Sequence, residues 1–132
     1  MRALALLILL AASPVMAADD TALGRDTFHG SCASCHGAEA KGGGPMSEIL
    51  TVEVPDLTTI AARNGGAFPW LKVIHIVDGR TGLRGHGDPM PVFGAVFTGD
   101  TSVADARDGT PVITSARVLA VVDYLAAIQA TP

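Results

Sequence analysis

The stretch Cys32-Ala33-Ser34-Cys35-His36 is the part of this chain that says most about its fold. Two cysteines separated by two residues lie one helical turn apart, where both thiols can form thioether bonds with the vinyl groups of one porphyrin edge. The histidine that follows then lies beneath the iron and can serve as its proximal ligand. The motif therefore predicts one covalently bound haem c, attached through Cys32 and Cys35 and ligated by His36.

Three other interpretations of the cysteine pair remain open. A thioredoxin-like redox pair normally follows a strand in a βαβ unit, and no such unit is expected here. A zinc site needs more ligands, but the chain has only two cysteines, and His29, His75 and His86 lack a matching spacing. The third interpretation is a plain disulfide. Haem attachment is favoured over all three.

The N-terminus has the pattern of a secretory signal. Met1-Arg2 is followed by an apolar run over residues 3–12 and by a small-residue cleavage site that ends at Ala17. The apolar run is shorter than the ~20 residues that span a bilayer, and Pro14 interrupts it. We expect a signal peptide over residues 1–17, a periplasmic protein with one domain over residues 18–132, and no later membrane span.

The charge of the chain excludes some partners. Its formal net charge is −4, and loss of the signal removes one arginine and no acid, which makes the charge more negative. Nucleic acid is not an expected partner, because binding it relies on clustered Lys and Arg. Lys41 and Lys72 are the only lysines, so a ring of lysines that steers the protein to an acidic partner is not available either.

The apolar periodicity predicts short helices joined by long loops, without strands. Because such a small core gains little stability from burial alone, a large apolar cofactor at its centre would complete it. The sequence therefore predicts an all-α fold wrapped around one haem, with Gly99–Pro111 interpreted as a surface loop. We expect the helices at about 21–31, 55–64, 69–78 and 115–128.

A second iron ligand is expected far from the motif. Met90 stands between two prolines, which stiffen the backbone and would hold its thioether toward the iron. A methionine is usually core filler, which is less expected in a polar loop. Met46 is too close to His36 to reach the opposite haem face easily, and His86 would give a bis-histidine centre. We predict His36 and Met90 as the axial ligands, a pair that favours ferrous iron.

Further motifs follow one another in a recognisable order along most of the mature chain. With them the sequence resembles the class I cytochrome c family, and the run over residues 55–79 is similar to small periplasmic cytochromes of alphaproteobacteria. The motifs are Gly24 and Phe28 before Cys32–His36, then Gly44-Pro45, Pro55–Thr58, Met90-Pro91 with Phe93-Gly94, and Asp123–Leu125.

The resemblance implies how the terminal helices pack. Gly24 and Phe28 should cross the last helix near Val121 and Tyr124. A glycine inside a helix is unfavourable by about 1 kcal/mol relative to alanine, so its presence is consistent with a close crossing.

The resemblance also implies polar contacts around the haem. The carbonyl of Pro45 should accept the Nδ1 proton of His36 and so fix the orientation of this ligand. Arg80, Arg84 or Trp70 should satisfy a buried haem propionate.

These expectations favour a soluble single-electron carrier that is not an enzyme. Its partners would be redox proteins that dock transiently through a small interface, with an apolar patch beside the thioether edge near Ala33. An alternative is a cytochrome subunit of a periplasmic dehydrogenase or oxidase. A peroxidase or ligand sensor would need an open sixth coordination position, and a thiol–disulfide enzyme would retain no haem.

Overall fold

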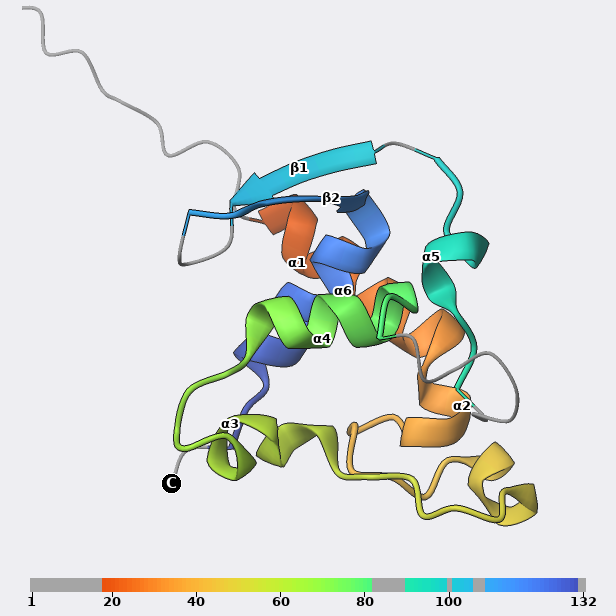
Figure 1. Ribbon diagram of the computed structural model, residues 1–132. Helices are drawn as coiled ribbons and strands as arrows, with labels where there is room; N and C mark the ends of the chain where they lie inside the picture. Colours follow the sequence, from red (N-terminus) through yellow and green to blue (C-terminus); the bar gives the residue numbers. More distant parts are fainter. Residues whose placement is uncertain (1–17, 82–89, 100, 106–108, 131–132) are drawn as a thin grey trace, which may run out of the picture.

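Short helices and one β-hairpin, joined by long loops, make up the chain (Figure 1). The computed structural model describes residues 18–81, 90–99, 101–105 and 109–130. The predicted signal peptide, residues 1–17, lies outside the described residues. In chain order the elements are α1 (Ala18–Ser31), α2 (Ala33–His36), the 3-10 turns η1 (Pro45–Ile49) and η2 (Leu57–Thr59), α3 (Ile60–Arg63), α4 (Trp70–Asp78), α5 (Phe93–Val96), β1 (Thr101–Asp105), β2 (Pro111–Ser115) and α6 (Ala116–Ala127).

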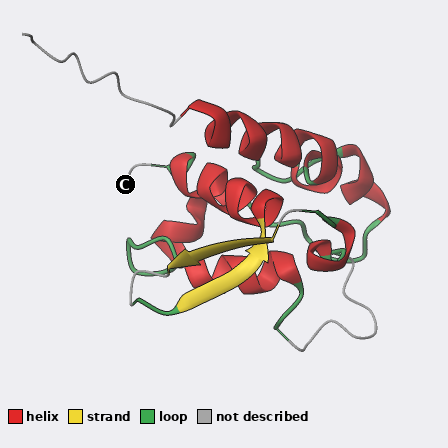
Figure 2. Ribbon diagram, turned by 90° about the horizontal axis from the view of Figure 1, so that it is seen from above, coloured by secondary structure: helices red, strands yellow, loops and turns green. Residues whose placement is uncertain are grey.

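The two terminal helices pack directly against each other, and the hairpin lies next to α6 (Figure 2). Gly24 of α1 lies against the backbone of Ala120 and the side chain of Tyr124. Phe28, one turn further along α1, is fully buried, and its ring centroid is 5.5 Å from that of Tyr124. The predicted crossing of these helices at Gly24 and Phe28 is confirmed, with Ala120 as the closest residue of α6.

The helix α4 completes the core from a third side. Its buried face consists of Val73, Ile74 and Val77, and the helix ends at Gly79, whose φ of 84° lies in the left-handed region. Glycine adopts this conformation without the steric penalty that a Cβ brings. The predicted bounds of this helix are therefore confirmed, with Pro69 just before the first helical residue.

The segment after Pro55 is less regular than the expected single helix. It begins as the 3-10 turn η2 and only then continues as α3. Asp56 caps it, because its Oδ1 accepts the backbone N–H of Thr58 at 2.8 Å and the Thr58 hydroxyl at 2.6 Å. An early side-chain cap of this kind tightens the first turn.

The expectation that the chain has no strands was wrong. The strands β1 and β2 pair antiparallel, with Val103 opposite Ile113. In β2, Val112 and Thr114 are buried, whereas Ile113 points outward. This alternation gives one face of the hairpin to α6, so part of the presumed surface loop 99–111 forms β1 instead. The small helical fold stands, but it includes this two-stranded sheet.

The last helix, α6, forms the centre of the core. The hydroxyl of Ser115 accepts the backbone N–H of Val118 at 3.2 Å and so caps the N-terminus of this helix. No helix in the described ranges combines the length and the apolar character that crossing a bilayer requires. The largest fully buried side chains are those of Phe28, Ile74, Val118, Val121 and Val122.

Candidate functional site

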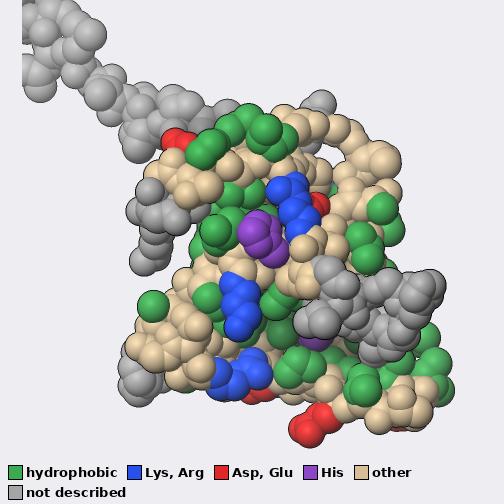
Figure 3. Space-filling view, in the orientation of Figure 1, with side chains coloured by type: hydrophobic (Ala, Val, Ile, Leu, Met, Phe, Trp, Pro, Cys, Tyr) green, Lys and Arg blue, Asp and Glu red, His purple; other side chains and the backbone are tan. Residues whose placement is uncertain are grey.

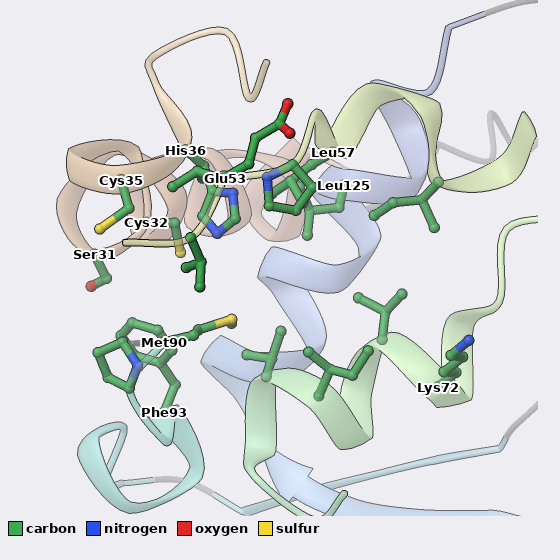
Figure 4. A pocket seen from close by; sticks show the side chains of 18 of the residues that line it. Ser31, Cys32, Cys35, His36, Glu53, Leu57, Lys72, Met90, Phe93 and Leu125 are labelled. Atoms are coloured by element: carbon green, nitrogen blue, oxygen red, sulfur yellow. The ribbon is translucent and has the colours of Figure 1, made fainter. Parts of the chain in front are cut away.

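A cavity of about 800 Å³ lies between α2, the segment 50–57, α4 and the start of α5 (Figure 4). Small-molecule and cofactor sites commonly have about 300–1,000 Å³, so this cavity can hold a large ligand. Most of its walls are apolar, including Val73, Ile76, Val77 and Leu125. Its remaining lining residues include Cys32, Cys35, His36, Met90 and, among polar side chains, Glu53, Arg63, Asn64 and Lys72.

The two cysteines line one wall of this cavity. Cys32 lies between α1 and α2 and keeps the chain helical, since its N–H donates to the Phe28 carbonyl at 2.8 Å and its carbonyl accepts from His36 at 3.0 Å. Neither cysteine forms a disulfide. Burial, with a smaller contribution from Cys35, raises the pKa of Cys32 to about 11. Catalytic thiols have lowered pKa values, so a thioredoxin-like role is disfavoured.

The imidazole of His36 lies half-buried in this wall. Its burial lowers the pKa of His36, although a backbone contact with Pro55 opposes the shift. A neutral imidazole is the form that binds a metal ion. The Nδ1 atom is buried and has no hydrogen-bond partner.

The expected hydrogen bond between the Pro45 carbonyl and His36 is absent from the structure. Pro45 is the first residue of η1, a 3-10 turn, and carbonyls in such turns bond to N–H groups three residues later. The prediction of this contact was therefore wrong.

A glycine loop supports the motif in a way that the sequence did not reveal. The N–H of Gly42 donates to the His36 carbonyl at 2.8 Å, and that of Gly44 donates to the Cys35 carbonyl at 3.1 Å. A Cβ on Gly44 would collide with the carbonyls of Ala33 and Ser34. The glycine run after Lys41 is the sequence signal for this close approach.

Met90 lies across the cavity from the histidine, and Figure 4 shows its sulfur pointing into the space below His36. The segment that follows Met90 packs closely on the end of α4. Gly79 contacts the side chain of Val92, and Gly94 contacts Asp78. These close approaches fix the position of the methionine relative to the cavity.

The alternative ligand Met46 does not lie opposite His36. Met46 is not among the lining residues of the cavity, and it is 44% exposed. His86 lies outside the described residues. Met90 is thus the methionine that the fold brings opposite His36.

The polar residues of the cavity lie apart from the cysteines. Figure 4 shows Lys72, on α4, on the other side of the cavity from Cys35. Arg63 and Asn64, at the end of α3, line the cavity as well. This arrangement gives the cavity a sulfur-bearing end and a cationic end.

The residues expected at a haem propionate are engaged elsewhere. Trp70 donates its indole N–H to Asp123 at 2.7 Å. Arg80 forms an ion pair with Asp78 and donates to a carbonyl of β2. Neither side chain lines the cavity, and Arg84 lies outside the described residues. Of the three predicted alternatives, Trp70 and Arg80 are thus disfavoured, and Arg84 stays a prediction.

The alternative of a zinc site finds no support in the described part of the chain. No three His, Cys, Asp or Glu side chains come together there in a way that could hold a metal ion. His29 and His75 do not line the cavity with the cysteines.

The fold and the cavity together define a small helical protein built around a large, mostly apolar ligand. The family model described as Cytochrome c matches residues 21–129, and the chain belongs to this family. The family binds haem c covalently and is generally one of electron carriers. No curated protein and no solved structure matches the chain. The two free thiols, the adjacent histidine on the same wall and the volume of the cavity fit the haem of this family.

Proposed function

We propose that this protein is a class I c-type cytochrome that carries single electrons between redox proteins of the periplasm. One observation supports this proposal more strongly than the other observations do. The cysteine pair and His36 lie on one wall of the cavity, and Met90 lies on the opposite wall. A ligand held between these walls has a side chain capable of binding iron on each face.

Each of the four residues has a distinct role in this proposal. Cys32 and Cys35 form the two thioether bonds, and the chain has no further cysteine for a second haem. His36 and Met90 are the axial ligands of the iron. When bound, haem supplies an iron that alternates between the ferric and ferrous states. With both axial positions taken by the protein, no position is open for a substrate, so we propose a carrier and not an enzyme.

The walls of the cavity set the conditions for this chemistry. Apolar side chains exclude water from the haem, and burial together with a methionine ligand raises the reduction potential. Porphyrin vinyl groups and propionates lie on different edges of the ring. A haem attached at Cys32 and Cys35 would hold its propionates away from this wall, and Lys72 on the other side of the cavity could neutralise their charge.

Export to the periplasm is part of the proposal. The pattern of residues 1–17 supports a signal peptide that is removed after Ala17. The similarity of residues 55–79 to small periplasmic cytochromes of alphaproteobacteria supports the same location.

Spectroscopy of two methionine variants tests the ligand assignment. We expect the near-infrared sulfur–iron band of the ferric protein to disappear in Met90→Ala and to remain in the matched control Met46→Ala. The opposite result would assign the ligand to Met46. Rapid binding of carbon monoxide by the ferrous wild-type protein at neutral pH would contradict a closed coordination sphere and with it the carrier function.

Haem that stays on the protein in a denaturing gel tests covalent attachment. We expect haem staining of the wild-type band and none for the double variant Cys32→Ser/Cys35→Ser. If the wild-type band carries no haem after expression with a haem-attachment system, the thiol–disulfide alternative regains support.

A further inference from the structure

The segment 45–54 exposes three large apolar side chains beside the cavity. The exposed fractions are 44% for Met46, 72% for Ile49 and 49% for Val52. Met46 and Ile49 are three residues apart in the 3-10 turn η1, and side chains with this spacing lie on the same side of such a turn. Single exposed apolar residues are common, but three in one short segment form a patch. We name Met46, Ile49 and Val52 the η1 patch.

The η1 patch adjoins the sulfur-bearing end of the cavity. Val52 lines the cavity together with Cys32 and Cys35, and η1 packs against α2, which carries the second cysteine. Electron tunnelling slows steeply with distance, so a redox partner must dock close to the haem edge that the cysteines hold. The η1 patch is in a suitable position for that contact.

The charges around the η1 patch are negative. Glu48 and Glu53 are exposed, and none of the ion pairs among the described residues involves them. The segment 45–54 contains no basic residue. The nearest lysine in the sequence, Lys41, is 3.6 Å from the carboxylate of Glu39. The rim of the patch therefore presents two carboxylates without a basic partner among the described residues.

The basic side chains gather on a different surface. Figure 3 shows Lys and Arg side chains in a row over α4 and α3, and Arg63, Lys72 and Arg80 belong to these elements or directly follow them. Among the described residues, these three cations lie away from the segment 45–54, and Lys41 is paired with Glu39. A partner that docks at the patch meets an apolar centre and an acidic rim.

We propose that the η1 patch docks a redox protein whose contact surface is apolar at its centre and carries lysine and arginine at its rim. Opposite charges at the rim align the two proteins and accelerate their encounter. A second copy of this chain is not the occupant, because its own patch would bring the same carboxylates into contact. The proposal rests on the proposed function and specifies the partner for it.

Electron exchange with coated gold electrodes tests this proposal on the haem-loaded protein. One electrode carries a mixed monolayer of methyl and ammonium end groups, which imitates the proposed partner, and the other carries methyl and carboxylate end groups. We expect about tenfold faster exchange at the ammonium surface, and the difference should shrink as salt screens the charges. Equal rates at the two surfaces would overturn the proposal.

Two substitutions locate the contact. Ile49→Ser should slow exchange at the ammonium surface by about threefold to tenfold, because it removes apolar contact area. The matched control Ile113→Ser changes an isoleucine that is 57% exposed on the hairpin and should leave the rate unchanged. Slowing by the control to the same extent would contradict a role of the η1 patch.

Charge reversal tests the rim separately. The double variant Glu48→Lys/Glu53→Lys should exchange electrons faster at the carboxylate surface than at the ammonium surface. An unchanged preference for the ammonium surface would contradict the role of the two acids.

A mediated titration in solution separates this proposal from the proposed function. If a one-electron transition is present but neither surface is preferred, only the docking proposal fails. If covalent haem or the one-electron transition is absent, the proposed function fails.

Discussion

The Cα of Gly24 lies against the carbonyl group of Ala120, so α1 and α6 cross without a side chain between their backbones. One turn further along α1, Phe28 fills the core, and its carbonyl accepts the N–H of Cys32 at 2.8 Å. The crossing therefore determines where the haem-attachment motif lies relative to α6, whose Leu125 forms part of the cavity wall.

Replacement of Gly24 by alanine should destabilise the protein. The added Cβ would overlap the Ala120 carbonyl, and overpacking typically costs about 1–3 kcal/mol. This loss should exceed the gain of about 1 kcal/mol in helix propensity. Gly30, in the same helix, is the matched control because a Cβ there meets nothing within 4 Å. In denaturant unfolding we expect a lower free energy of unfolding than wild type for Gly24→Ala, and an equal or slightly higher one for Gly30→Ala, which gains helix propensity without a clash. Equal stability of the two variants would contradict the close crossing.

Replacement of Gln129 should also lower the stability of the fold. Its amide donates to the carbonyls of Leu57 at 2.8 Å and Leu125 at 2.7 Å, and its side-chain oxygen accepts the N–H of Ala61 at 2.8 Å. The residue therefore ties the end of α6 to η2 and α3. Gln129→Ala should lower the free energy of unfolding by about 1–3 kcal/mol, since it leaves partly buried groups without partners.

The variant Gln129→Glu separates the hydrogen bonds from simple loss of the side chain. At neutral pH a carboxylate cannot donate to the two carbonyls, so the variant should also be destabilised. At acidic pH, the protonated carboxyl regains one donor and the deficit relative to wild type should narrow. A deficit that does not change with pH would argue that packing, and not hydrogen bonding, makes Gln129 important.

Local patterns in the sequence were sufficient to predict the family and most helices, and they favoured Met90, which lines the cavity, over Met46, which does not. The Cys32–His36 motif has a fixed chemistry that does not depend on distant residues, and the Cytochrome c assignment agrees with it. The end of α4 at Gly79 and the cap of α6 at Ser115 follow from single residues with strong local preferences. The individual roles of the four haem-site residues remain predictions.

The features that escaped prediction depend on contacts between distant parts of the chain. Each strand of the hairpin has five residues, and their side chains alternate over too short a distance to stand out from a loop rich in Gly, Asp and Thr. Without β2, the sequence could not indicate that Arg80 would donate to a carbonyl of that strand. The unpaired Nδ1 of His36 likewise follows from how η1 is oriented, which no local pattern specifies.

Asp56 should make the stability of the protein depend on pH in the acidic range. The hydroxyl of Thr58 is the main cause that lowers the pKa of Asp56, with smaller contributions from Lys41 and Arg63. Because the pKa is lower in the folded state, the stabilisation is complete above the unfolded pKa of about 3.9 and is lost as the pH falls through the folded pKa. Asp56→Asn should therefore be less stable than wild type at neutral pH and equally stable in strong acid.

Thr58→Val provides the control for this effect. It removes the hydroxyl that donates to Asp56 at 2.6 Å but keeps the backbone N–H that donates at 2.8 Å. The difference in unfolding free energy between pH 7 and strong acid should become smaller than in wild type but should not vanish. If Asp56→Asn keeps the full wild-type pH dependence, another carboxyl group is responsible for it.

Lys72 should raise the reduction potential if haem occupies the cavity as proposed. This lysine is exposed and lines the cationic end of the cavity, where its charge disfavours the more positive ferric iron. In water, unit charges a few ångströms apart interact by about 1 kcal/mol or less, so Lys72→Met should lower the potential by roughly 10–40 mV for one electron. Lys41→Met is the matched control, because Lys41 pairs with Glu39 and does not line the cavity. A redox titration of both variants in low salt decides between two orientations of the haem in the cavity. A larger decrease for Lys41→Met would mean that the propionate edge faces the glycine loop, and the proposed orientation of the haem would then be wrong.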